Sequence, residues 1–217
     1  MKRICIDLSA MNSDYKGGVN TYIHGILSGI YKVKTIIRFK IVCTNQVYKS
    51  IKNYKSKNIN FVKVKEPPTF YKYLLKICVV LNSRELYYFI NNLKWQKITS
   101  ICDEIGDITY IPTTILNGYN GLKPRIISIH DIQFMHYPEN FRFFELRSMR
   151  IAYYLSVKFS HTIQASSEFI KKDLLKNYNF LKKKFIPVIR EGIDINKFRI
   201  KKKNKKKKIL KNYLFYQ

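Results

Sequence analysis

The order of apolar segments at the start of the chain constrains its fold most. Residues 3–8 form a short apolar run suited to a buried strand, and the polar loop after it ends in Gly17 and Gly18. Apolar residues then recur at helical spacing over residues 19–32, and residues 36–44 return to strand character. Strand, loop, helix and strand make a βαβ unit, which predicts a parallel sheet.

The same alternation continues along the chain. Apolar, β-branched runs predict strands at residues 60–64, 107–112, 125–131, 162–165 and 185–189. Helical spacing predicts helices at residues 69–102, 141–159 and 168–177, the last preceded by Ser166 and Ser167 as N-cap candidates. The sequence therefore predicts an α/β fold with a parallel sheet flanked by helices.

The charge of the chain is strongly basic. It has 41 Lys and Arg residues against 14 Asp and Glu residues, a formal net charge of +27. Residues 182–211 hold 14 basic residues and two acids, and thus +12 of that charge. The other lysines are spread over most segments, so the charge fits two causes. One is an acidic partner, either nucleic acid or an anionic membrane, and the other is the composition that AT-rich coding DNA produces.

Residues 69–102 interleave aromatic and basic side chains, among them Tyr73, Trp95, Lys76 and Arg84. An ordinary helix packed on the sheet is the favoured interpretation. The alternative is a helix in a membrane interface, with its aromatic side chains in the lipid and its lysines at the headgroups.

Several classes of protein do not fit the composition. A hydrophobic content of 46% argues against disorder for most of the chain. No apolar run approaches the roughly 20 residues that a bilayer-spanning helix needs, and the N-terminal residues show no signal-peptide pattern. The cysteines form no CxxC pair, which predicts small buried side chains in a reducing cytosol rather than a zinc site or disulfides: Cys5, Cys43, Cys78 and Cys102.

The C-terminal part of the chain differs from the rest. The lysine-rich tract at residues 199–208 predicts a solvated linker. Residues 209–217 form an apolar, strand-like segment that no further element follows. We expect this segment to be the truncated first strand of a missing C-terminal domain, with residues 1–198 as the N-terminal domain.

Glycine and polar residues stand at the carboxyl ends of two predicted strands, where open parallel sheets bind ligands. Gly17 and Gly18 precede a predicted helix, and free amides at a helix N-terminus suit a phosphate or a sugar. They are not part of a GxGxxG motif, so the dinucleotide fingerprint is absent. His130 can donate to a sugar hydroxyl, and Asp131 can orient a loop. A simple turn and a structural histidine are the alternatives.

Taken in order and spacing, four blocks resemble the retaining glycosyltransferases of the GT-B type, the group called family 4. Residues 17–22 resemble its glycine-rich loop, and residues 126–138 its strand, His-Asp pair and downstream proline. Residues 160–174 are similar to its strand, serine cap and helix. Residues 185–198 are similar to the stretch that leaves its N-terminal domain.

The resemblance implies a Rossmann-like parallel sheet flanked by helices, the acceptor-side N-terminal half of a GT-B enzyme. His130 is then the candidate catalytic residue, which would bond the donor sugar or polarise the reacting hydroxyl. Gly17, Gly18 and Asp131 are the candidate donor- and acceptor-binding residues, the glycines through amides near the sugar or its β-phosphate and the aspartate in a more structural role. A nucleotide-sugar serves as substrate, and no cofactor or metal site is implied.

The leading hypothesis is retaining hexosyl transfer from a nucleotide-sugar to a glycan or lipid-linked acceptor, in bacterial surface polysaccharide or lipopolysaccharide synthesis. The expected location is cytoplasmic, with peripheral contact on the anionic inner membrane face. Because the donor would be held mainly by a second domain, which a separate gene could encode, we expect this chain alone to be inactive.

One feature departs from the family pattern. Arg190 and Glu191 stand where the family has an asparagine before Gly192. The alternatives are a non-catalytic basic module that binds nucleic acid or an anionic membrane, and a decayed gene product without activity. Nucleic acid is the less favoured partner because no recognised binding motif accompanies the charge.

Overall fold

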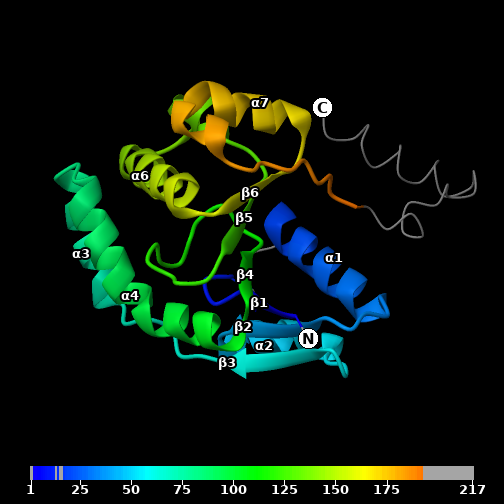
Figure 1. Ribbon diagram of the computed structural model, residues 1–217. Coiled ribbons are helices and arrows are strands. Elements are labelled where there is room, and N and C mark those ends of the chain that lie inside the picture. Colours follow the sequence, from blue (N-terminus) through cyan, green and yellow to red (C-terminus); the bar gives the residue numbers. More distant parts are fainter. Residues whose placement is uncertain (1, 13, 15–16, 193–217) are drawn as a thin grey trace, which may run out of the picture.

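Six parallel strands form a single sheet with helices on both faces (Figure 1). The computed structural model describes residues 2–12, 14 and 17–192. Its strands are β1 (Arg3–Asp7), β2 (Arg38–Cys43), β3 (Ile59–Lys63), β4 (Ile108–Ile111), β5 (Arg125–Ile129) and β6 (Thr162–Ala165). Their order is β3-β2-β1-β4-β5-β6, and each neighbouring pair is parallel. This is the doubly wound strand order, so the predicted α/β, Rossmann-like fold is confirmed.

Helices lie between all consecutive strands except β4 and β5. The helices are α1 (Gly18–Lys32), α2 (Asn45–Ile51), α3 (Phe70–Val80), α4 (Arg84–Ile105), α5 (Gln133–His136), α6 (Phe143–Phe159) and α7 (Glu168–Asn177). Short 3-10 turns lie at Lys52–Tyr54, Pro138–Asn140 and Asn179–Lys183. Within the described ranges, no helix is long and apolar enough to cross a bilayer.

The alternation of side chains along β1 separates two layers of core. Ile6 packs with Ile23 and Leu27 of α1 on one face of the sheet. Cys5, its neighbour, packs with Trp95 of α4 on the other face. Because successive strand residues point to opposite faces, one five-residue strand anchors helices on both sides.

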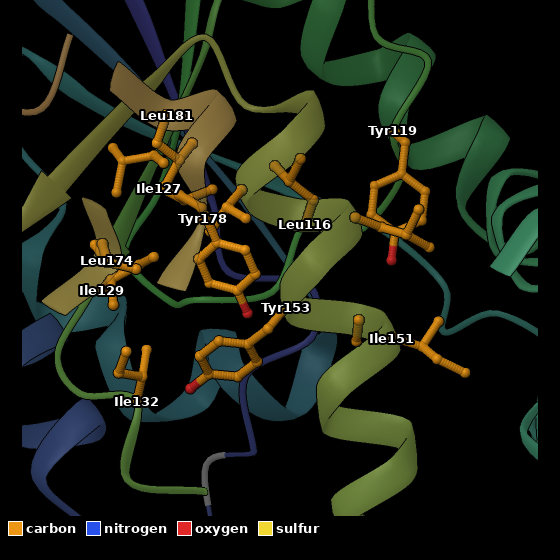
Figure 2. Close-up of a cluster of buried hydrophobic side chains, with 14 of the residues drawn as sticks. Leu116, Tyr119, Ile127, Ile129, Ile132, Ile151, Tyr153, Leu174, Tyr178 and Leu181 are labelled. Carbon is orange, nitrogen blue, oxygen red and sulfur yellow. The ribbon is translucent and has the colours of Figure 1, made fainter. Parts of the chain in front are cut away.

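The β4–β6 half of the sheet has its own core, shown in Figure 2. Ile127 and Ile129 of β5 lie under α7 and the turn after it, and Tyr153 reaches toward them from α6. Leu116 and Tyr119 enter the same cluster from the long connection between β4 and β5. Burial holds the pKa of the Tyr119 phenol well above its ordinary value, so the hydroxyl is neutral in the folded protein.

The helix predicted at residues 69–102 is two helices, α3 and α4. The chain turns at Asn82, whose φ of 53° places it in the left-handed region that Asn tolerates. Ser83 then caps α4, since its hydroxyl accepts a hydrogen bond of 3.1 Å from the Leu86 N–H. The apolar pattern runs through this turn without interruption, which is why periodicity alone did not reveal it.

The predicted strand at residues 185–189 is wrong as a regular strand. Phe185 and Val188 form only isolated parallel bridges, to Thr162 and Ala165 of β6. The intervening Pro187 accepts a hydrogen bond from the Ala165 N–H but has no N–H of its own to donate. The segment therefore lies along the edge of the sheet with an interrupted ladder.

The prediction for the cysteines is tested by the structure. The four cysteines are buried and free, as predicted for small core side chains. Burial raises the pKa of the Cys43 thiol to about 11, so it stays protonated. The predicted linker at 199–208, the strand-like segment at 209–217 and the domain boundary at residue 198 lie outside the described residues.

Candidate functional site

The strand order places a topological switch point between β1 and β4, at the centre of the sheet. From β1 the chain winds outward through β2 to β3, and from β4 it winds the other way through β5 to β6. The connections after β1 and β4 thus leave in opposite directions at their carboxyl ends. In doubly wound sheets this is the position at which ligands bind.

The glycine pair lies at this edge, at the start of α1. Gly17 is the N-cap residue, and no side chain caps the helix there. Among the described residues, no atom lies within 4 Å of the position that a Cβ on Gly18 would take. The amides of the first turn have no intrahelical partner and can donate to an anion or a sugar hydroxyl.

His130 follows β5 directly and is held from three sides. Its Nδ1 lies 2.7 Å from Oε1 of Glu191, and its Nε2 lies 3.5 Å from the carbonyl oxygen of Pro112. The imidazole also meets the ring of Tyr22 edge to face, with centroids 4.7 Å apart. Since Tyr22 lies one turn into α1, the structure brings His130 beside the helix that the two glycines open.

A hydrogen-bond network beneath this histidine joins α1 to three strands. The Tyr22 hydroxyl lies 2.8 Å from that of Tyr110 on β4 and accepts a 2.8 Å bond from Nε2 of Gln164 on β6. Tyr110 is also 2.8 Å from the hydroxyl of Ser128 on β5. Burial keeps the pKa of Tyr110 far above its ordinary value, so the network consists of neutral groups. It fixes Tyr22, and Tyr22 in turn contacts the imidazole of His130.

Two aspartates organise the loops around the site. Asp131 is exposed, and its Oδ1 accepts a 3.1 Å bond from the Gln133 N–H, which starts α5. Asp7 is buried at the end of β1 and accepts from the backbone and hydroxyl of Ser9 and from Nδ2 of Asn117. Asp131 thus orients its own loop, while Asp7 ties the loop after β1 to the connection between β4 and β5.

Sequence reasoning placed Gly17, Gly18 and His130 at strand ends but missed the residues that position the histidine. The sequence singles out Glu191 only as a departure from a family motif. The signal that could have found it is an acidic residue two positions after the last apolar segment. Tyr22 and Tyr110 look like core residues in the sequence because they follow helical and strand periodicity. The pairing of β4, β5 and β6 had to be known before their hydroxyls could be placed together.

The arrangement suits hydrogen-bond and proton chemistry at one nitrogen. A carboxylate on Nδ1 favours the tautomer with the hydrogen on Nδ1 and orients the ring. In that neutral tautomer Nε2 can accept from a bound hydroxyl, and once the ring is protonated Nε2 can donate to it. Among the residues that the structure describes, no three His, Cys, Asp or Glu side chains gather as a metal site would require.

Comparison with known proteins finds similarity among solved structures. No protein-family model matches the chain, and no curated protein does. Among solved structures it is similar to the N-terminal domain of Candida albicans trehalose-6-phosphate phosphatase, at 13% identity and a TM-score of 0.48 over 97% of this chain and 54% of that one. It is also similar to Medicago truncatula UGT71G1 complexed with UDP-glucose, at 10% identity and a TM-score of 0.48 over 90% of this chain and 52% of that one. The chain thus spans about half the length of each of these two chains.

Proposed function

We propose that this chain is the acceptor-side half of a retaining glycosyltransferase of the GT-B type, which transfers a hexosyl group from a nucleotide-sugar to a glycan or lipid-linked acceptor. The observation that carries the proposal is the meeting of α1 and His130 through Tyr22 at the carboxyl ends of the central strands. A helix end with free amides and an oriented imidazole are what a sugar phosphate and a reacting hydroxyl require. Two of the four sequence blocks that resemble family 4, residues 17–22 and 126–138, contribute Tyr22 and His130.

Each residue has a stated role in the proposal. The amides that follow Gly17 and Gly18 bind the donor sugar or its β-phosphate, and Nε2 of His130 bonds the donor sugar or polarises the reacting hydroxyl. Asp131 and Glu191 are positioning residues, one for its loop and one for the imidazole. Transfer with retention relies on positioning and on stabilising an oxocarbenium-like state as the diphosphate leaves.

The donor's nucleotide is held, in this proposal, by a second domain that completes the cleft. The first experiment is therefore to read the DNA downstream of the last codon and to join or co-express any second half found there. The completed protein is then incubated with labelled UDP-, GDP- and ADP-hexoses in the presence of glycan and lipid extracts. Transfer of label to either extract is the expected result, and its absence with every donor would contradict the proposal.

A matched pair of histidine variants tests the assigned site in that assay. His130→Ala should lower the rate about 100-fold or more while the protein stays folded. His136→Ala is the control, because Nε2 of His136 also bonds a carboxylate, Oδ2 of Asp173 at 2.5 Å, but in a contact between α5 and α7. That variant should retain the rate within about twofold. An unchanged rate for His130→Ala would remove the histidine from the mechanism.

A further inference from the structure

The helix α3 and the start of α6 carry apolar side chains that no other part of the described chain covers. In Figure 1 α3 stands at the edge of the molecule, where it packs against α4 and α6. It buries only Cys78 and Val79. Most of its other apolar residues are more than half exposed: Phe70, Tyr73, Ile77, Val80 and the adjoining Leu81. Phe143 and Phe144 continue this surface on α6. An exposed apolar surface of this extent marks a contact with another surface.

Beside these apolar residues a cavity of about 350 Å³ opens between the α3–α4 turn and α6. Three guanidinium groups line it, those of Arg84, Arg147 and Arg150, over an apolar floor that includes Leu146. Among the described residues, none of the three arginines lies within 4 Å of a carboxylate. The cavity therefore holds uncompensated positive charge, which suits an anion.

Two of the arginines are held in place by neutral groups. The guanidinium of Arg84 lies over the ring of Tyr154, 4.4 Å from its centroid. Nε of Arg147 donates to Oδ1 of Asn82 at 3.3 Å, and the same guanidinium lies 5.5 Å from the centroid of the Phe143 ring. These contacts fix the side chains and leave their remaining N–H groups for a ligand.

We infer that this face docks on an anionic lipid bilayer, with the arginine cavity taking the phosphate of a lipid headgroup. The apolar side chains of α3 would enter the boundary between headgroups and acyl chains, while Lys72 and Lys76 remain at the headgroup level. A helix without acidic residues meets no repulsion from an anionic leaflet. The inference stands on this surface alone and does not depend on the proposed transferase activity.

Nucleic acid fits this face less well than lipid. A phosphate backbone would bond the arginines, but Ile77, Val80 and Leu81 would gain nothing from it, since these aliphatic chains offer no stacking surface. A bilayer supplies both a phosphate for the cavity and an apolar phase for the side chains around it. The two chemistries occur side by side on the protein as they do at a membrane surface.

The test is co-sedimentation of the whole chain with vesicles of phosphatidylcholine alone and of phosphatidylcholine mixed equally with phosphatidylglycerol. The wild-type protein should bind the mixed vesicles and leave the neutral ones. Arg147→Gln with Arg150→Gln should weaken that binding by about fivefold for each guanidinium, about 25-fold together. Lys49→Gln with Lys52→Gln removes the same charge from exposed positions at α2, on the opposite face of the sheet from α4, and should change binding by less than about twofold.

The apolar part is tested with variants that cannot disturb the core. Tyr73→Ser with Ile77→Ser should lower binding to the mixed vesicles at least about tenfold. The exposed pair Phe169→Ser with Ile36→Ser, one on α7 and one before β2, should leave it unchanged. Circular dichroism checks that each variant is folded.

Three outcomes would overturn the inference. The first is that the wild-type protein fails to bind phosphatidylglycerol vesicles. The second is that the α2 control pair weakens binding as much as the arginine pair, since the general charge of the chain would then explain it. The third is tighter binding to a single-stranded RNA oligonucleotide that is lost with the arginine pair but not with the Tyr73 and Ile77 pair, which would make nucleic acid the partner.

Discussion

His130 and Glu191 lie 61 residues apart in the sequence, yet Nδ1 of the imidazole is 2.7 Å from Oε1 of the carboxylate. Glu191 is nearly half exposed and His130 is much less so, so the carboxylate approaches the ring from the solvent side. In the proposed enzyme the carboxylate acts through the imidazole, because it fixes the ring and its tautomer without contacting the substrate.

Glu191→Ala should therefore lower kcat about tenfold and leave KM for the nucleotide-sugar nearly unchanged. Glu191→Gln should retain more activity, because the amide oxygen still accepts a bond from the Nδ1–H. The steady-state kinetics of the completed protein give both parameters, with the exposed Glu139→Ala as the control. A rise in KM at constant kcat would instead place Glu191 in direct contact with the donor.

The sequence predicted the parallel sheet because each buried strand is a short apolar run between polar segments. It predicted Gly17, Gly18 and His130 as edge residues for the same reason, since they directly follow or precede such runs. Glu191 escaped this reasoning because its position depends on how residues 185–189 lie along β6, and Pro187 breaks the pattern there. Which strand lies next to which decides the site, and hydropathy does not report it.

The surface that we propose to bind lipid could likewise be predicted only in part from the sequence. The interleaving of basic and aromatic residues at 69–102 was visible in the sequence, with a core helix as the favoured interpretation. The structure supports that interpretation for α4, which buries Trp95, Ile98 and Cys102. It does not support it for α3, most of which is exposed. The turn at Asn82 divides the segment into a buried helix and an exposed one.

The Tyr22 hydroxyl should contribute measurably to stability. Tyr22→Phe removes a partner from both the Tyr110 hydroxyl and the Gln164 amide, which lie in the partly buried network. We expect the free energy of unfolding to fall by about 1–2 kcal/mol, measured by urea denaturation. Tyr31→Phe, on the same helix but half exposed, should change it by less than about 0.5 kcal/mol. Equal effects of the two variants would show that the network adds nothing.

The ion pair of Arg3 and Asp107 should make the free energy of unfolding depend on pH in the acid range. The side-chain bonds from the Arg3 guanidinium and the bond from its backbone N–H hold the pKa of the Asp107 carboxyl below its usual 3.8. Since the folded pKa is the lower one, the stabilisation is present above pH 4 and is lost as the pH falls through the folded value.

Urea unfolding of the wild type and of Asp107→Asn at a series of pH values measures this effect. The difference in unfolding free energy between them should be constant near neutral pH and should shrink toward zero in acid. The exposed Glu139→Gln serves as the control. A difference that does not depend on pH would mean that the carboxylate contributes nothing through its charge.

Lys184 caps the end of α6. Its ammonium donates to the carbonyl oxygens of Val157 at 2.6 Å, of Lys158 at 3.1 Å and of Ser160. Lys184→Met keeps much of the side-chain length but leaves these acceptors without a donor, so we expect a loss of about 1–3 kcal/mol in the free energy of unfolding. Lys183→Met, at the exposed neighbouring position, should have almost no effect in the same denaturation experiment. A similar loss in both variants would rule out a capping role.

Gly121 is required by the buried Arg125 beside it. A Cβ at position 121 would lie 1.9 Å from Nη2 of Arg125, whose side chain is only 4% exposed. That guanidinium donates through Nη1 to the Gly118 carbonyl oxygen at 2.7 Å and lies 3.8 Å from the Asp103 carboxylate. It therefore cannot move aside without leaving a buried charge unpaired. Gly121→Ala should therefore cost about 3–5 kcal/mol of unfolding free energy.

Gly25→Ala, inside α1 with no atom within 4 Å of the added methyl group, should raise the free energy of unfolding by about 0.5–1 kcal/mol. Both substitutions replace glycine with alanine, but their expected effects on stability have opposite signs. If both variants shift the melting temperature in the same direction, the contact between position 121 and Arg125 does not determine the stability of this loop.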